Sequence, residues 1–143
     1  MKVKGRYLVV FLFLIVTILG RTFDANAADA SAYLEWGNAY FQQGKYEQAI
    51  ANYTKAIELN PNFVEAYSMR GLVYSIKKEY DKAIADYTKA IELNPTDAEA
   101  YNNRGITYYF LGNIEKACAD AKKACDLGDC KALNFLQSKG HCK

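Results

Sequence analysis

The sequence predicts an all-α protein built from stacked pairs of helices, and three observations support this. The decapeptide at 52–61, NYTKAIELNP, returns almost unchanged at 86–95 as DYTKAIELNP, 34 residues later. In three frames of 34 residues (30–63, 64–97 and 98–131), the first two are identical at 17 positions. Within each frame, apolar residues recur every three or four residues, which is the helical period. Because one helix pair cannot bury its apolar face alone, such repeats stack on one another.

The first 27 residues form a segment of a different kind. Three basic residues precede an apolar run at 7–19, and the sequence ANA follows at 25–27. A basic start, a short apolar core and an A-x-A site are typical of a secretory signal peptide, and this core is short for a membrane-spanning helix. We therefore expect an exported protein, periplasmic or extracellular, with cleavage after Ala27. Cleavage after Ala30 and an uncleaved anchor are the two alternatives.

The remaining residues, 28–143, form one expected domain of balanced charge. They contain 14 basic and 15 acidic residues, so the net charge is about −1. Basic residues cluster only in short runs (Lys77–Lys78 and Lys122–Lys123), which are typical of solvated helix faces rather than of a nucleic-acid surface. We expect no nucleic-acid partner, and no membrane contact once the signal peptide is removed.

Small residues recur at fixed places in each frame and predict close helix packing. We expect Gly37 and Ala49 to face each other where the two helices of the first frame approach, with Tyr40 and Tyr53 wedged beside them. The dipeptide Asn60-Pro61 is expected to end the second helix. Proline disfavours a helical conformation in the residue before it and cannot continue the hydrogen-bond ladder.

The turn inside each helix pair falls at one position of the frame. Gly44 and Gly112 occupy this position in the first and third frames, and Lys78 occupies it in the second. A left-handed backbone at this position suits glycine and strains lysine. The sequence therefore predicts a slightly strained turn in the second frame.

Two charged positions vary together between frames. Arg70 and Arg104 accompany Asp86 and Asp120, whereas the first frame has Trp and Asn at these places. Antiparallel helices bring the two positions together, so we expect an ion pair inside the second and third helix pairs. As a surface interaction, such a pair contributes only ~0 to 1 kcal/mol.

The repeated motif resembles the tetratricopeptide repeat (TPR). The family pattern of aromatic, Gly, Tyr, Ala, aromatic, Ala and Pro falls in the first frame on Tyr33, Gly37, Tyr40, Ala49, Tyr53, Ala56 and Pro61. In the second frame it falls on Tyr67, Gly71, Tyr74, Ala83, Tyr87, Ala90 and Pro95. The third frame departs from it, with Ala121 in place of the second aromatic and Asp129 in place of proline. The resemblance implies a right-handed α-solenoid of three helix-turn-helix units whose concave surface binds peptides or proteins.

In the family that this chain resembles, the first helix of each unit lines the concave groove. The corresponding residues here are mostly apolar, aromatic or amide side chains. The expected groove residues are Leu34, Asn38, Phe41, Gln42, Ser68, Leu72, Ser75, Ile76, Asn102, Ile106, Tyr109 and Phe110.

Some members of that family hold a C-terminal carboxylate with Lys or Arg side chains beside Asn. Only Asn38 matches that arrangement here. Leu34, Asn102 and Asn103 stand where cations would be needed. We therefore do not expect a carboxylate clamp.

The last quarter of the chain contains all four cysteines, Cys118, Cys125, Cys130 and Cys142. An even number in an exported chain indicates disulfides, and four cysteines permit three pairings. Cys118 and Cys125 lie ~10.5 Å apart along one predicted helix, beyond the ~7 Å that a disulfide spans. We expect 129–139 to form a capping helix antiparallel to the preceding one. In such a hairpin, residues close to the turn contact each other, and residues far from the turn contact each other. This nesting of contacts favours Cys125–Cys130 and Cys118–Cys142 over the crossed pairing.

The sequence as a whole indicates an exported scaffold that binds an unidentified protein or peptide in its groove. We expect no catalysis, no cofactor and no metal, because the single histidine, His141, is near the C-terminus and no C-x-x-C pair exists. One alternative is a subunit of an envelope or secretion assembly that binds through its edges or convex face. Another is a redox-responsive or metal-responsive protein that uses its cysteines.

Overall fold

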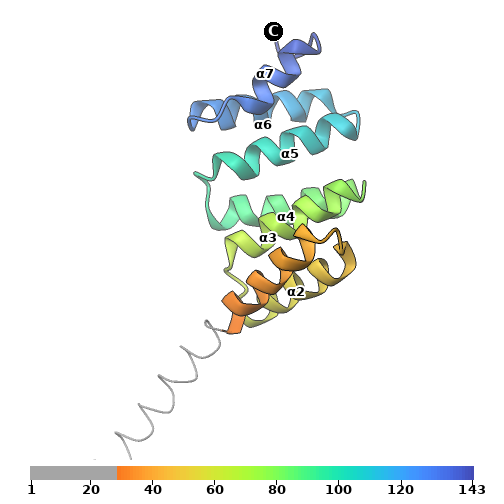
Figure 1. The fold of residues 1–143 in the computed structure, drawn as a ribbon. Coiled ribbons are helices and arrows are strands. Elements are labelled where there is room, and N and C mark those ends of the chain that lie inside the picture. The colour runs from red at the N-terminus through yellow and green to blue at the C-terminus, as the bar shows by residue number, and fades with distance from the viewer. Residues whose placement is uncertain (1–28) are drawn as a thin grey trace, which may run out of the picture.

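The computed structural model describes residues 29–143, and these residues form an all-α, right-handed solenoid without strands. The expected signal peptide at 1–27 lies outside the described residues. The described chain begins with a helix over 29–42. It continues with α2 (Tyr46–Leu59), α3 (Val64–Ile76), α4 (Tyr80–Leu93), α5 (Ala98–Phe110), α6 (Ile114–Asp126) and α7 (Lys131–Ser138). Figure 1 shows the helices stacked in chain order, with α7 at the C-terminal end of the stack.

The core between the helices consists mainly of alanine and tyrosine side chains. Ala49, Ala56 and Tyr53 of α2 are fully buried, and they pack with Leu34 of the first helix and Val73 of α3. Alanine at these places lets neighbouring helices approach closely, while the larger rings fill the space that remains. The small residues that recur in the sequence therefore lie where the helices of the solenoid pack against one another.

Two glycines of the first helices, Gly37 and Gly71, lie against aromatic rings. A Cβ atom on Gly37 would overlap the ring of Tyr53, the aromatic side chain that the sequence places beside Gly37. A Cβ atom on Gly71 would lie 3.0 Å from the Cε1 atom of Tyr87 in the same way. Glycine is therefore required wherever the second helix carries tyrosine at this level.

The turns inside the helix pairs adopt the backbone conformation that the sequence predicts. Gly44, Lys78 and Gly112 have φ angles of +71°, +62° and +86°. The α2 and α4 helices end at Leu59 and Leu93, immediately before their Asn-Pro dipeptides. Lys78 is thus a lysine in a conformation that favours glycine.

The expected ion pairs are confirmed, but they are more enclosed than surface pairs. The Nε and Nη2 atoms of Arg70 donate to the two carboxylate oxygens of Asp86 at 2.7 and 2.8 Å. The Nη1 atom of Arg70 donates to Thr54 Oγ1 of the preceding repeat at 2.9 Å. The side chain of Asp86 is only 9% exposed. The same contacts recur in the third repeat among Arg104, Asp120 and Thr88.

The C-terminal helix is attached to the third repeat by two disulfides. Cys118 is bonded to Cys142 with Cα atoms 5.3 Å apart, and Cys125 is bonded to Cys130 with Cα atoms 4.0 Å apart. These are the pairs that the nesting argument favours. The α7 helix begins at Lys131, two residues later than expected, because Cys130 has a backbone conformation outside the helix.

Candidate functional site

The first helices of the three pairs form one face of the solenoid, and two hollows lie along it. A hollow of about 330 Å³ lies between α3 and α5 and is lined by Val64, Glu65, Ser68, Met69, Asp97 and Glu99. A hollow of about 300 Å³ lies between α5 and α7 and is lined by Glu99, Asn102, Asn103, Ile106, Asp129, Lys131, Ala132 and Phe135. Both hollows open beside residues that the sequence assigns to the groove.

Several of the expected groove residues are accessible in the structure. Ile76 and Phe110 are 43% and 56% exposed, and Gln42 is exposed as well. Half-buried side chains lie between them, and these are Asn38, Phe41, Ser68, Leu72, Ser75, Ile106 and Tyr109. The face therefore presents apolar and aromatic groups mixed with small polar groups.

Two residues assigned to the groove are buried in the structure. Leu34 is 6% exposed and packs in the core beside Tyr53, because the second helix pair covers it. Asn102 is 5% exposed and lies under α7, where its Oδ1 atom accepts a hydrogen bond from the backbone N–H of Ala132 at 3.1 Å. Leu34 therefore belongs to the core, whereas Asn102 lines the hollow between α5 and α7 with little exposed surface.

Aromatic rings organise the C-terminal end of this face. The ring of Phe110 stacks on Tyr80 with centroids 6.2 Å apart and an interplanar angle of 10°. The ring of Tyr109 meets Phe135 of α7 edge to face at 5.4 Å and contacts His141 at 5.8 Å. Tyr109 is thus held by the capping helix, whereas Phe110 is 56% exposed.

Polar side chains on the same face are partly engaged with one another. The Tyr53 hydroxyl donates to Asn38 Oδ1 at 2.7 Å, so this amide oxygen already has a partner. Burial raises the pKa of Tyr53 to about 12, with a smaller contribution from the negative charge of Glu65. Ser75 Oγ and Thr107 Oγ1 lie 3.2 Å apart and share a hydrogen bond between α3 and α5.

Carboxylates dominate the charge of the two hollows. Glu65 and Glu99 are exposed in the first turns of α3 and α5, while Asp97 accepts a hydrogen bond from the N–H of Ala100 at the start of α5. Lys131 is the single basic residue lining either hollow, and its Nζ atom is paired with Asp129 at 3.1 Å. This end of the groove is therefore negatively charged.

The negative charge of Asp129 is maintained by its neighbours. The backbone N–H of Lys131 donates to Asp129 Oδ1 at 3.2 Å, and this contact is the main reason that the pKa of Asp129 lies below its ordinary value. The sequence pattern did not assign Asp97 or Asp129 to the groove. Each aspartate stands just before a helix that borders the groove, at a position where Asp is a common capping residue. This position in the sequence could have identified both residues.

Other site classes have little support in the described residues. All four cysteines are in disulfides, and no group of three or more His, Cys, Asp or Glu side chains within 29–143 is arranged to hold a metal ion. Within the same range, no helix has the length and apolarity needed to span a membrane.

Comparison with known proteins places the repeats in one family. A family described as "TPR repeat" matches residues 37–77 and 75–112, and one described as "Tetratricopeptide repeat" matches 98–127. The chain is also 44% identical over 46 residues to Hsp70-Hsp90 organizing protein 3 of Arabidopsis thaliana. That match spans 32% of this chain and only 8% of the length of the relative.

Solved TPR domains share this fold over most of their length. The first TPR of Spaghetti (RPAP3) bound to the HSP90 peptide SRMEEVD is 32% identical, with a TM-score of 0.75, and covers 78% of this chain and 90% of its own. The second TPR domain of human RPAP3 in complex with the HSP70 peptide SGPTIEEVD is 29% identical, with a TM-score of 0.72 and coverages of 81% and 96%. The Arabidopsis OM64 TPR domain is 26% identical, with a TM-score of 0.76 and coverages of 80% and 95%. The family models and the solved domains each match most of the solenoid. The chain therefore belongs to the tetratricopeptide repeat family, whose fold is a protein-interaction fold.

Proposed function

We propose that this chain is an exported scaffold that binds a peptide or protein segment in its concave groove. The observation that carries the proposal is the pair of exposed apolar side chains, Ile76 and Phe110, at the ends of α3 and α5. Exposed apolar groups that line one face of a soluble domain commonly mark an interaction site. The similar RPAP3 domains, whose structures contain bound peptides, support a peptide as the ligand.

Export is supported by two independent features of the chain. The segment 1–27 has the pattern of a signal peptide, and the structure contains two disulfides. Disulfides persist in oxidising compartments such as the bacterial periplasm or the extracellular space. We propose one of these two locations.

The charge of the groove restricts the ligand. The peptides in the two RPAP3 structures end in Glu-Glu-Val-Asp and are therefore acidic. In this chain Glu65, Asp97, Glu99 and Asp129 line the hollows, so an acidic C-terminus would be repelled. We propose a ligand segment that is apolar and neutral or basic.

Affinity capture with matched variants tests the groove. The protein and its variants are used to capture binding proteins from an envelope or secretion extract, and each captured protein is then titrated in purified form. We expect Phe110→Ala to lower affinity at least about tenfold. Leu111→Ala is the control, because Leu111 is adjacent in sequence, similarly exposed at 46%, and outside the expected groove. Equal loss of binding in both variants, or in neither, contradicts the proposal.

A defined peptide tests the charge argument separately. We expect SRMEEVD labelled with a fluorophore to show no saturable anisotropy change with this protein at low salt. The variant Glu65→Lys with Glu99→Lys should bind the same peptide more tightly, because it removes the repulsion. Tight binding of SRMEEVD by the unmodified protein would contradict the proposed ligand chemistry without affecting the location of the groove.

A further inference from the structure

Two side chains of the groove carry a buried polar atom that has no hydrogen-bond partner among the described residues. These atoms are Ser68 Oγ, in the hollow between α3 and α5, and Asn102 Nδ2, in the hollow between α5 and α7. Both residues stand at the fifth position of their 34-residue frames, so the two hollows occupy equivalent places in successive repeats. A buried donor without a partner costs stability, and an opening beside it allows a bound group to supply the missing acceptor.

Asn102 is the more enclosed of the two residues, and α7 fixes the orientation of its amide. The residue is 5% exposed, and its side chain lies 3.1 Å from the backbone nitrogen of Ala132. Because that N–H group can only donate, the atom facing it is the amide oxygen, and the Nδ2 atom lies on the other side.

The amide nitrogen of Asn102 faces the hollow that it shares with Asp129. The pKa of Asp129 is lowered mainly by the backbone N–H of Lys131, and the amide of Asn102 adds a smaller effect. Both Asn102 and Asp129 line the hollow. An amide nitrogen carries two N–H bonds, so at least one of them is available to a ligand even where the other is directed toward the carboxylate.

The rest of this hollow supplies negative charge and apolar surface. The carboxylates of Glu99 and Asp129 line it, and so do the apolar side chains of Ile106 and Phe135. The Nζ atom of Lys131 lies 3.1 Å from Asp129, but the lysine side chain is 87% exposed, so this contact is weak and another cation can replace it. The group that complements the hollow carries a positive charge on an apolar stem, as basic side chains do.

We propose that the hollow between α5 and α7 is a subsite for an arginine side chain of the bound segment, an inference that rests on the proposed function. The guanidinium pairs with the carboxylates of Glu99 and Asp129, and its methylene groups lie against Ile106 and Phe135. A backbone carbonyl of the segment accepts a hydrogen bond from Asn102 Nδ2. Arginine suits this hollow better than lysine, because its planar guanidinium donates to several oxygen atoms in fixed directions.

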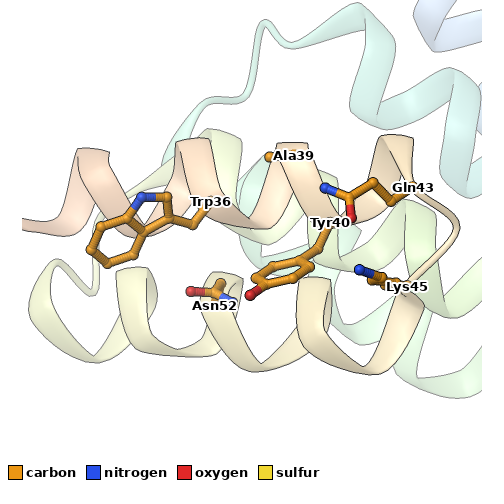
Figure 2. A pocket seen from close by; sticks show the side chains of 6 residues that line it. All are labelled: Trp36, Ala39, Tyr40, Gln43, Lys45 and Asn52. Atoms are coloured by element: carbon orange, nitrogen blue, oxygen red, sulfur yellow. The ribbon is translucent and has the colours of Figure 1, made fainter.

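A third hollow shows that this combination is not a general property of the solenoid. It has a volume of about 530 Å³, lies between the first helix and α2, and is lined by Trp36, Ala39, Tyr40, Gln43, Lys45 and Asn52 (Figure 2). Its one charged lining residue is the basic Lys45, and Asn52 Nδ2 already donates to the backbone oxygen of Gln48 at 2.8 Å. Negative charge and an unpartnered buried donor therefore do not accompany every hollow.

A blocked arginine tests the subsite without the rest of the ligand. Protein produced from the full 143-residue sequence is isotope-labelled and titrated with N-acetylarginine N-methylamide, which carries one guanidinium and two carbonyl groups. We expect saturating NMR shifts at the side-chain amide of Asn102 and at the backbone of Asp129, with a dissociation constant of about 1–10 mM for so small a ligand. The indole N–H of Trp36 reports on the hollow of Figure 2 and should not shift.

Matched controls separate the proposed contacts from general attraction to an acidic surface. The citrulline compound has the same shape without the charge and should bind at least about tenfold more weakly. Glu99→Gln should weaken arginine binding about threefold or more. Glu115→Gln is its control and should leave binding unchanged, because Glu115 is also the exposed second residue of its helix but does not line the hollow.

Four results would overturn the proposal. They are no saturation up to ~100 mM, equal binding of the citrulline compound, equal weakening in the Glu99 and Glu115 variants, and saturating shifts at Trp36 instead of Asn102. If Phe110→Ala weakens a captured ligand while blocked arginine does not bind, the groove is right and the subsite is wrong. If blocked arginine binds as expected while Phe110→Ala and Leu111→Ala behave alike, the subsite is right and the proposed groove contact is wrong.

Discussion

At the scale of single residues, this fold depends on a few positions where the backbone or a buried ring restricts the choice of side chain. Lys78 adopts a φ angle of +62°, whereas its counterparts Gly44 and Gly112 are glycines. Gly37 and Gly71 lie against the rings of Tyr53 and Tyr87. Such positions tolerate one kind of residue, and they therefore give the clearest tests.

Replacing Lys78 with glycine is expected to stabilise the protein. A side chain in the left-handed region costs about 1 kcal/mol, and glycine avoids that cost. We expect Lys78→Gly to raise the free energy of unfolding by about 0.5–1 kcal/mol in urea titrations. Lys78→Ala is the control, since it removes the long side chain but keeps the strain. An equal gain in the alanine variant would contradict the backbone explanation.

Tyr53 gives the protein a pH dependence above neutrality. Its pKa is raised from 10.0 to about 12, mainly because burial disfavours the phenolate, and burial raises the pKa of Tyr87 as well. A folded-state pKa above the unfolded value contributes stability below pH 10 that is lost as the pH rises toward 12. For Tyr53 alone this amounts to about 2–3 kcal/mol.

Urea titrations between pH 8 and pH 11 measure this effect. The free energy of unfolding should fall as the pH rises above about 10, the unperturbed pKa of tyrosine. Tyr53→Phe should reduce the slope without abolishing it, because Tyr87 remains. The variant loses its hydrogen bond to Asn38, so the comparison concerns slopes and not absolute stabilities. Identical slopes in the two proteins would contradict the assignment to Tyr53.

At the scale of elements, the repeats are joined by a polar contact that crosses two helices and a repeat boundary. Arg70 reaches Asp86 of its own repeat and Thr54 of the preceding one, and Arg104 repeats this arrangement. The pair is enclosed, with 17% and 9% of the two side chains exposed. Its removal should therefore have larger consequences than that of an exposed pair.

Breaking one side of this pair is expected to be strongly destabilising. Asp86→Ala leaves a mostly buried guanidinium without its partner, and we expect a loss of about 3–5 kcal/mol. The double replacement of Arg70 by Met and Asp86 by Leu should cost clearly less, because no unpaired charge remains. Glu58→Ala is the control, because its pair with Lys55 is exposed to solvent and its loss should change stability little. Additive effects of the Arg70 and Asp86 replacements would contradict the coupling.

Local signals predicted the elements well, whereas burial depended on contacts beyond one frame. The repeat spacing, the Asn-Pro dipeptides and the turn positions gave helices that the structure confirms. The resemblance to the repeat family placed Leu34 and Asn102 in the groove, yet a neighbouring repeat covers Leu34 and α7 covers Asn102. Asp97 and Asp129 line the hollows because successive helices meet beside them. A frame-by-frame reading cannot contain such information, because these contacts join residues of different frames.

At the scale of the whole molecule, the solenoid is closed at one end and open at the other. The third repeat has Ala121 where the other two have tyrosine. Gly105 therefore lies close to the backbone of α6, and a Cβ atom on Gly105 would be 3.2 Å from the carbonyl oxygen of Ala117. The α7 helix covers Ala121 and Ala117 with Leu136. The disulfides keep that cover in place, whereas no such cover is present at the N-terminal edge within residues 29–143.

The two disulfides should contribute unequally to this closure. Cys118–Cys142 joins residues 24 apart in the sequence, and Cys125–Cys130 joins residues 5 apart. A longer loop loses more freedom in the unfolded chain, so we expect Cys118→Ser with Cys142→Ser to cost about 3.5 kcal/mol and Cys125→Ser with Cys130→Ser about 2 kcal/mol. Urea titrations under non-reducing conditions compare the two, and limited proteolysis should cut the first variant earliest near α7. An equal or greater cost for the short loop would show that native contacts around Gly128, and not the entropy of the unfolded chain, determine how the cap is held.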